Sequence, residues 1–210
     1  MTQATSRPRR GRPPKVPRDD PDTRAALIRS GVEVLTEQGF TASGIDGILR
    51  RVGVPKGSFY YYFDSKEAFG HAVMAHYAAY FAAKLDRHLL DASRPPLQRL
   101  EAFVDDARAG MARHDFRRGC LVGNLGQEVG GLPESYRRRL RETLADWQRR
   151  VAVCLREAQS GGELAEAADC ERLAEAFWIG WEGAVMRARL EGDARPLDTF
   201  LATYLEGLPR

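Results

Sequence analysis

The sequence predicts an all-α protein with a three-helix domain at its N-terminus and a larger helical domain after it. Apolar residues recur at helical spacing through most of the chain, and no segment has the features of a strand. Glycine, proline and capping residues interrupt this pattern at intervals of helix length. Near the N-terminus, two short periodic segments are separated by only a few residues, which is typical of a helix-turn-helix.

The first two helices of the N-terminal domain are delimited by capping residues. A helix is expected near 22–38, where Asp22 can cap its beginning and Gly39 ends it. A second helix is expected over 44–52, with Ser43 as a candidate N-cap. Its buried face is predicted from apolar residues at i, i+3, i+4 and i+7, namely Ile45, Ile48, Leu49 and Val52.

The third helix follows a very short turn. Gly53 lies where a helix C-terminus favours a positive φ, and Pro55 opens the next helix at a position where a missing N–H does no harm. Lys56 and a run of aromatic residues come next. A helix of this kind after a tight turn is typical of a segment that enters a DNA groove. We therefore assign residues 21–66 to a helix-turn-helix domain.

The second domain, residues 67–210, is expected to be helical throughout. Ser65 can cap a long helix that runs to about Leu90 and joins the two domains. Pro133 begins another long helix, which ends near Gly161. The remaining helices are expected near 97–113, 119–129, 168–190 and 195–207.

The composition narrows the class of protein. With 43% hydrophobic and 29% charged residues, the chain can form a core, and no apolar run is long enough for a membrane span. The arginine- and proline-rich N-terminus has no apolar segment behind it, which argues against a secretory signal. The three cysteines lack the spacing of a zinc site or a disulfide framework. We therefore expect a cytoplasmic protein that has no bound metal or cofactor and no membrane association.

Positive charge is concentrated at the N-terminal end. Residues 1–66 hold 12 Lys and Arg against 7 Asp and Glu, although the net charge of the whole chain is only +3. Residues 1–20 are predicted to be a disordered basic arm. Within this arm, Arg10 and Arg12 lie in an Arg-Gly-Arg-Pro segment suited to the narrow minor groove of A·T-rich DNA. A basic tail that only increases solubility is the alternative.

The helix-turn-helix resembles the DNA-binding domain of the TetR family of one-component transcriptional repressors. The matching segments are Gly-Phe at 39–40, Ile-Asp-Gly-Ile-Leu at 45–49, Gly-Val-Pro-Lys-Gly-Ser-Phe-Tyr-Tyr-Tyr-Phe at 53–63 and Ser-Lys-Glu at 65–67. The resemblance implies a homodimer that binds a near-palindromic operator in double-stranded DNA. It also implies that the C-terminal domain binds a small-molecule inducer and then releases the DNA.

The expected DNA contacts combine groove readout with phosphate binding. Phe59 and Phe63 are assigned to the core, but three successive phenols cannot all face inward on one helix. Asp46 stands where many relatives have arginine, so the sequence departs from the family pattern at that contact. The candidate DNA-binding residues are Ser43, Lys56, Gly57, Ser58, Tyr60, Tyr61, Tyr62 and Lys66.

A second segment, Arg-Gly-Cys-Leu-Val-Gly-Asn-Leu-Gly-Gln-Glu at 118–128, resembles the subgroup of these repressors that senses acrylate, N-ethylmaleimide and other electrophilic or unsaturated compounds. Cys120 follows Arg117 and Arg118 and is expected to begin a helix. Both features favour the thiolate, so we predict a lowered pKa and a reactive thiol. A buried, unreactive cysteine is the alternative.

Other candidate inducer contacts are grouped around Cys120. Asn124 and Gln127 follow it at i+4 and i+7, and Arg108 is expected to pair with a carboxylate inducer. Aromatic walls are expected from Tyr77, Trp178 and Trp181. The alternatives are a solvated Arg108 and aromatic residues that serve only the core. Dimerisation is expected through 133–158 and 169–190, using Leu140, Leu144, Trp147, Val151, Leu155, Phe177, Trp181 and Val185.

Three other functions are alternatives to a repressor. A thiol enzyme is disfavoured because Cys120 and His114 have no third group to orient them. An architectural DNA-binding protein would leave about 140 residues of the second domain without a role. An activator of the same fold cannot be distinguished from a repressor by sequence.

Overall fold

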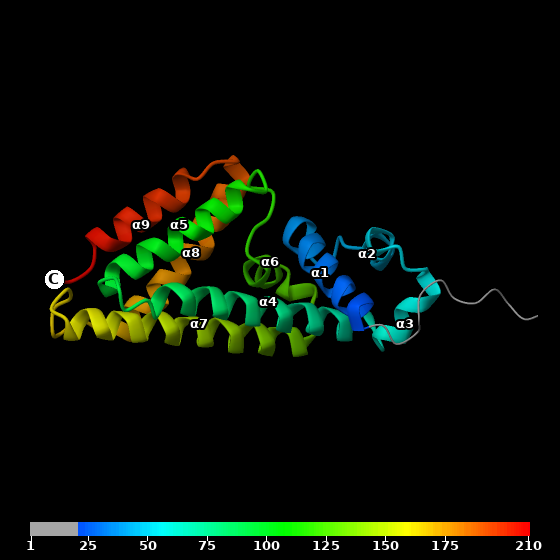
Figure 1. Ribbon diagram of the computed structural model, residues 1–210, viewed down its shortest axis with the longest axis horizontal. Helices are drawn as coiled ribbons and strands as arrows, with labels where there is room; N and C mark the ends of the chain where they lie inside the picture. Colours follow the sequence, from blue (N-terminus) through cyan, green and yellow to red (C-terminus); the bar gives the residue numbers. More distant parts are fainter. Residues whose placement is uncertain (1–20) are drawn as a thin grey trace, which may run out of the picture.

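The computed structural model describes residues 21–210, and these residues form helices without any strand (Figure 1). The basic arm, with Arg10 and Arg12, lies outside the described residues. The helices are α1 (Pro21–Gln38), α2 (Ile45–Val52), α3 (Phe59–Tyr62), α4 (Lys66–Leu89), α5 (Pro96–Ala112), α6 (Leu121–Gln127), α7 (Glu134–Ser160), α8 (Cys170–Glu191) and α9 (Arg195–Glu206). Short 3₁₀ turns at Lys56–Ser58 and Val129–Gly131 precede α3 and follow α6. The predicted all-α fold is confirmed.

The turn between α2 and α3 has the predicted geometry. Gly53 adopts φ of +73°. At this end of α2, the backbone N–H groups of Gly53 and Val54 donate to the carbonyls of Arg50 and Leu49. Phe59 of α3 and Phe63, the residue directly after α3, are buried and pack against Phe69 of α4, with ring centroids 5.7 and 4.9 Å from it. This aromatic contact fixes α3 against the first turns of α4.

The beginning of α2 differs from the prediction. Gly44 is the N-cap, and no side chain caps the helix. Ser43 is 3% exposed, and its hydroxyl donates to the carbonyl of Gly39. The expectation that Ser43 caps α2 is therefore wrong, because its hydroxyl closes the loop after α1 instead. By contrast, Ser65 caps α4 as predicted, accepting from the N–H of Ala68 at 3.0 Å.

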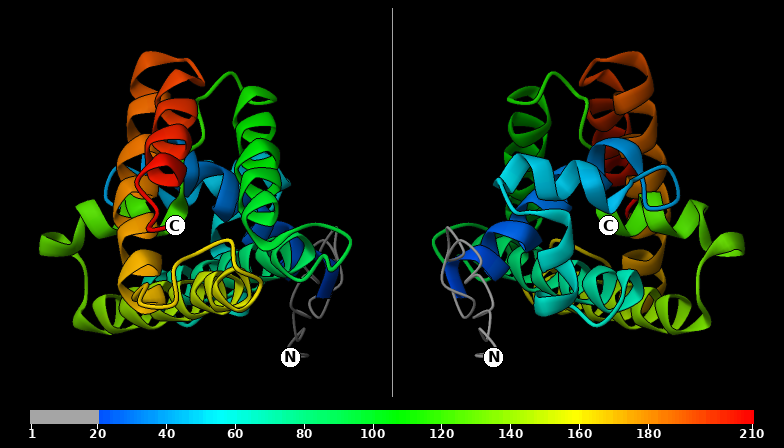
Figure 2. Two further views of the ribbon diagram at one scale, coloured as in Figure 1. Left: turned by 90° about the vertical axis from the view of Figure 1, so that its left-hand side faces the viewer. Right: turned by 90° about the vertical axis from the view of Figure 1, so that its right-hand side faces the viewer.

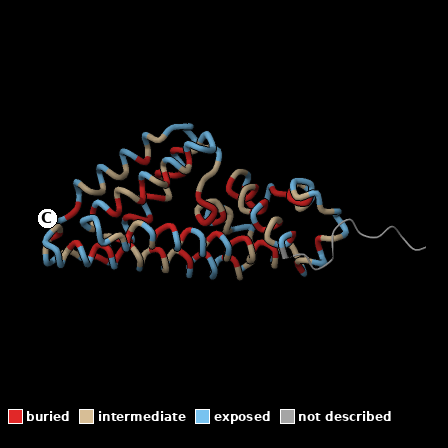
Figure 3. The backbone as a smooth tube through the Cα atoms, viewed as in Figure 1, coloured by how far each residue is buried: buried red, intermediate tan, exposed pale blue. Residues whose placement is uncertain are grey.

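Two long helices form the base of the molecule. In Figure 1, α4 and α7 run side by side along the long axis, and α4 continues from the C-terminal domain to the helix-turn-helix. In the end-on views of Figure 2, α5 lies on one side and α8 and α9 on the other, above α4 and α7. The buried backbone positions face the space enclosed by these helices (Figure 3).

Aromatic side chains fill the centre of the C-terminal domain. Trp147 of α7 lies between Phe81 of α4 and Trp178 of α8, with ring centroids 4.3 and 5.2 Å away. Trp181 and Phe103 continue this cluster at 5.2 Å from each other. These rings bury a large apolar area, so they supply much of the hydrophobic stabilisation of the domain.

The expected dimer residues are mostly part of this internal core. Leu140, Trp147, Val151, Leu155, Phe177, Trp181 and Val185 are all buried within one chain. The exposed apolar side chains on the same two helices are Val153, Ile179, Met186 and Leu190. The prediction that these side chains form the interface is wrong, because they are buried inside one chain, whereas dimerisation through 133–158 and 169–190 stays a prediction.

Close packing joins the N-terminal domain to α4. A Cβ at Gly31 of α1 would lie 2.6 Å from Phe69 and 2.7 Å from Val73, both on α4. Only glycine allows the two helices to cross at this separation. Because α1 also contacts α6, the DNA-reading head is held by helices of the C-terminal domain. Within the described residues, no helix combines the length and apolar character needed to cross a membrane.

Candidate DNA-reading surface and ligand cavity

The aromatic residues of α3 divide into an inner and an outer set. Phe59 and Phe63 are 2% and 4% exposed, whereas Tyr60 and Tyr61 are 70% and 48% exposed. Tyr62 is half-buried and packs edge-on against Tyr61 at 5.3 Å. The predicted burial of the two phenylalanines is confirmed, and the outer phenols form a surface that projects from the head.

The turn before α3 is open to solvent and carries one positive charge. A Cβ at Gly57 would meet no atom within 4 Å, and Ser58 is half-buried beside it. Lys56 Nζ lies 2.8 Å from a carboxylate oxygen of Asp46, and this bond raises the pKa of Lys56. Both side chains are highly exposed, so the pair is weak and DNA phosphate can compete for the ammonium group.

Lys66 has contacts that sequence reasoning did not anticipate. Its ammonium group donates to the carbonyls of Phe40 and Ser43 at 3.2 and 3.0 Å, and it lies 4.4 Å from the centre of the Phe40 ring. Lys66 therefore holds the α1–α2 loop against the beginning of α4. Ser43 is turned inward in the same loop, where it is 3% exposed and its hydroxyl donates to the carbonyl of Gly39.

A cavity of about 360 Å³ lies between the head and the C-terminal domain. Its walls come from α1, α4, α5, the α5–α6 loop and α8, and they include Tyr77, Cys120 and Trp181. The charged residues of this lining are mainly basic. Among the residues that the structure describes, Glu33 is the acidic one. The cations and histidines are Arg29, His76, Lys84, Arg113, His114 and Arg118.

Lys84 is the most buried cation of this cavity. Its side chain is 9% exposed and lies 3.2 Å from the carboxylate of Asp106, which also accepts a hydrogen bond from His88 at 3.0 Å. Burial lowers the pKa of Lys84, and Asp106 offsets part of this effect. An anionic ligand would favour the charged form further, so this wall is suited to a carboxylate.

A second cavity of about 380 Å³ lies on the other side of Cys120. It is lined by residues of α6 and α8 that include Asn124, Gln127, Glu182 and Arg189. Cys120 lines both cavities and thus forms part of the wall between them. The structure brings Cys120, Asn124 and Gln127 together, as their helical spacing predicted.

Two of the predicted inducer contacts lie elsewhere. Arg108 pairs with Asp198 of α9 at 2.8 Å and with Asp105 at 3.0 Å, and it lines neither of the two cavities. Trp178 is 4% exposed within the aromatic core and also lines neither cavity. The alternatives are therefore supported: the side chain of Arg108 is 41% exposed in surface ion pairs, and Trp178 is part of the core.

The environment of Cys120 is opposite to the predicted one. The thiol is at the N-cap of α6, where it accepts from the N–H of Gly123 at 3.5 Å, and the residue is 5% exposed. Burial, reinforced by the nearby carboxyl group of Glu182, raises the pKa of Cys120 well above its ordinary value. The expectation of a lowered pKa is wrong, since Arg117 pairs with Asp115 and Arg118 with Glu37.

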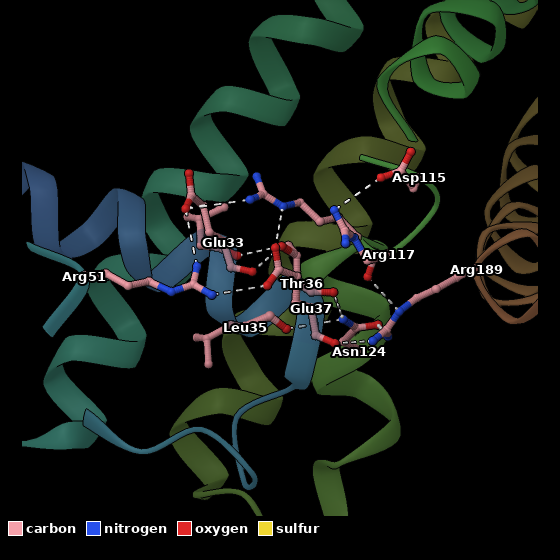
Figure 4. Close-up of polar contacts among 11 residues, drawn as sticks. Glu33, Leu35, Thr36, Glu37, Arg51, Asp115, Arg117, Asn124 and Arg189 are labelled. Atoms are coloured by element: carbon pink, nitrogen blue, oxygen red, sulfur yellow. Dashed lines mark hydrogen bonds and ion pairs between the residues drawn. The ribbon is translucent and has the colours of Figure 1, made fainter. Parts of the chain in front are cut away.

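A network of polar side chains binds the last carbonyl groups of α1 (Figure 4). The amide group of Asn124 donates to the carbonyls of Thr36 and Leu35 at 3.0 and 3.3 Å. Arg189 of α8 donates to the carbonyl of Glu37 and to the side-chain oxygen of Asn124. The last carbonyls of a helix lack partners within it and carry partial negative charge, so these donors dock α1 on the C-terminal domain.

Ion pairs extend this network into the helix-turn-helix. Glu37 accepts from Arg118 at 2.9 Å and lies 3.5 Å from Arg51 of α2. Burial alone would raise the pKa of Glu37, but the two arginines reverse this effect and lower it. Arg118 also lines the first cavity, so one side chain touches both the ligand space and the end of α1. Sequence reasoning missed Glu37, Arg51 and Arg189.

The α1–α2 loop is also held from the C-terminal domain. The carboxylate of Glu128, at the end of α6, accepts from the backbone N–H groups of Phe40 and Thr41 at 2.9 and 2.7 Å. Burial would raise the pKa of Glu128, but these bonds lower it overall. Gly39 has φ of +79°, and a Cβ there would overlap the Glu128 carboxylate. Glycine is required for both reasons.

Comparison with known families accounts for both halves of the molecule. The model described as bacterial regulatory proteins, tetR family, matches residues 27–73. The model described as tetracyclin repressor-like, C-terminal domain, matches residues 96–204, more than half of the chain. The chain belongs to the tetR family of bacterial regulatory proteins.

Individual tetR-family proteins are similar over nearly the whole length. The transcriptional regulator AcuR of Cereibacter sphaeroides is 54% identical over 94% of this chain and 90% of its own. The transcriptional repressors DhaR of Mycobacterium sp. and NemR of Escherichia coli are each 32% identical, over 88% and 86% of this chain and 91% of their own.

Solved structures of the family agree with this fold. The regulatory protein TetR from Rhodobacter sphaeroides has a TM-score of 0.87 at 53% identity, over 89% of this chain and 98% of its own. The reduced form of Escherichia coli NemR has a TM-score of 0.79 at 28% identity, over 87% and 95%. As a tetR-family member, the protein is a DNA-binding, ligand-responsive transcriptional regulator and not an enzyme.

Proposed function

We propose that this protein is a cytoplasmic repressor that binds a near-palindromic operator as a homodimer and is released by a small unsaturated carboxylate or electrophile, such as acrylate. One observation carries the proposal: the cavity beside Cys120 is lined both by α1 of the head and by helices of the C-terminal domain. A ligand in that space touches both parts and can change how they are docked.

On the DNA side, the exposed phenols of Tyr60 and Tyr61 and the ammonium group of Lys56 supply the contact surface. Gly57 leaves the backbone before α3 free to approach the edges of bases. Two identical heads read half-sites separated by about one turn of DNA. With roughly four phosphate contacts per head, log K falls against log salt with a slope of about −7.

On the ligand side, the charge of the cavity supports an anion. Arg118 lies at one wall and Lys84 at another, and the Cys120 thiol and the Tyr77 phenol lie on the wall nearest to α6. A carboxylate can pair with these cations while an unsaturated carbon chain rests against Trp181. This combination of cationic wall, aromatic surface and thiol fits acrylate and its analogues.

The switch acts through the contacts at the end of α1. A carboxylate that binds Arg118 competes with Glu37 and Glu33, which lie 2.9 and 3.7 Å from this arginine. Weakening these pairs loosens α1, and with it α2 through Arg51, on the C-terminal domain. The two α3 helices then lose their spacing on the operator. A differential ligand affinity equivalent to a few kcal/mol is enough for release.

The test is binding of the purified dimer to the DNA upstream of its own gene, followed by fluorescence anisotropy. Acrylate and N-ethylmaleimide should each release the DNA, whereas propionate, which lacks the double bond, should act only at higher concentration. Arg118→Ala should weaken the response to acrylate. Failure of every unsaturated compound to release bound DNA would refute the proposed inducer class, and failure to bind the DNA would refute the repressor itself.

A further inference from the structure

Glu182 places a carboxyl group against the wall that Cys120 forms between the two cavities. It is on α8 and lines the second cavity together with Cys120 and Gly123. A Cβ at Gly123 would overlap a carboxylate oxygen of Glu182, so the glycine leaves the space that this side chain occupies. A Cβ at Gly123 would also lie 3.6 Å from Cys120, so the two side chains meet at this glycine, and each changes the pKa of the other.

One oxygen of this carboxyl group lacks a partner. The Oε1 atom of Glu182 is buried and accepts no hydrogen bond from any residue that the structure describes. A buried carboxylate oxygen without a donor is costly, so the group is driven to take up a proton or to share one with a neighbour. Burial raises the pKa of Glu182 to about 7, which makes both protonation states accessible near neutral pH.

Of the groups around Glu182, the Cys120 thiol is the one suited to exchange a proton with it. Tyr77 of α4 lines the first cavity on the other side of Cys120, and burial raises its pKa well above the ordinary value, so it stays neutral. Arg189, on α8, directs its guanidinium group to Glu37, Arg117 and Asn124. Gln127 and Asn124 of α6 do not titrate. The Cys120 thiol is the remaining acid in contact with the carboxyl group.

We propose that Glu182 carries the proton of the Cys120 thiol when this thiol adds to an α,β-unsaturated carbonyl compound. The inference rests on the proposed function and adds the proton-transfer residue. The Glu182 carboxylate accepts the S–H proton as the sulfur forms a bond to the β-carbon. The π electrons of the C=C bond move to the α-carbon and its carbonyl. Protonated Glu182 then returns the proton to the α-carbon, and no oxidant or leaving group is needed.

This role explains how a buried, neutral thiol can still react. The raised pKa of Cys120 leaves very little thiolate at neutral pH, and the thiolate is the nucleophile. A positioned general base typically increases such a rate by about 10²- to 10⁴-fold. The thiol therefore stays unreactive in the absence of a base and reacts with an acceptor that enters beside Glu182.

The experiment measures alkylation of Cys120 in the intact protein by N-ethylmaleimide, followed by peptide mass spectrometry as a function of pH. In the wild type, the rate should rise through about pH 7 and then level off, because the carboxylate form of Glu182 is required. Glu182→Gln should react about tenfold or more slowly at neutral pH and should lose this step. Glu182→Asp should retain part of the rate. Glu175→Gln is the matched control, because it removes the same charge from an exposed position on α8. This variant should react like the wild type.

Two results would overturn the inference. A wild-type rate that increases tenfold per pH unit without levelling off would mean that free thiolate alone reacts, and this result does not depend on any variant. An equal or faster rate in Glu182→Gln would mean that the carboxylate only suppresses ionisation of the thiol. Release of the operator DNA is measured separately. If Cys120 is alkylated through Glu182 but the DNA stays bound, the proposed function alone is refuted. If the DNA is released while Cys120 stays unmodified, the inference alone is refuted.

Discussion

The contact between α8 and the end of α1 can be tested at Arg189. Arg189→Ala removes the donors to the carbonyls of Glu37 and Arg117 and to the side chain of Asn124, the last two at 3.1 and 3.4 Å. Arg187→Ala is the matched control. Arg187 lies on the same helix, but its partner is Glu191 on the exposed side of that helix.

The two substitutions should differ clearly in magnitude. Hydrogen bonds from a charged donor contribute about 1.5–3 kcal/mol when their loss leaves acceptors without partners. Because Arg189 is half-buried and water can replace part of its role, we expect a total loss of about 2 kcal/mol. The exposed pair of Arg187 should contribute at most about 0.5 kcal/mol. For a chain of this size, each kcal/mol corresponds to a change in Tm of about 2–4 °C.

The assay is thermal unfolding by circular dichroism at matched protein concentration, followed by operator binding. Arg189→Ala should lower Tm by about 4–8 °C, and Arg187→Ala by about 2 °C or less. The first variant should also bind the operator more weakly, since its heads are less firmly docked. Equal shifts in Tm for the two variants would show that the network at the end of α1 does not hold the head.

Three further outcomes follow from single side chains. Gly39→Ala should lower Tm by several degrees, because φ is +79° and a Cβ would overlap Glu128; an unchanged Tm would contradict this packing. Glu182→Gln should raise stability more at about pH 8 than at about pH 5. Burial raises the pKa of Glu182 from 4.5 to about 7, so the wild type loses stability as the pH rises between these values, and parallel urea-unfolding results at the two pH values would contradict this. Lys56→Ala should reduce the salt slope of operator binding by about 2 for the dimer, and an unchanged slope would mean that Lys56 stays paired with Asp46.

The local pattern of the sequence determined the helices and the two faces of the reading helix. Gly53 and Ser65 act at helix ends through their own backbone and side-chain chemistry, so their roles are readable from neighbouring residues. The same holds for Phe59 and Tyr60, whose side chains point to different faces of α3, one to the core and one to solvent.

The tertiary structure decided the chemistry of the site, because that chemistry depends on residues far apart in the chain. Cys120 gains a raised pKa from burial and from Glu182, which is 62 positions away and gives no local signal. Ser43 turns inward to Gly39, and Arg108 pairs with Asp198 across two helices. Burial and charge at these positions are set by which helices pack together, and helical periodicity alone does not specify that packing.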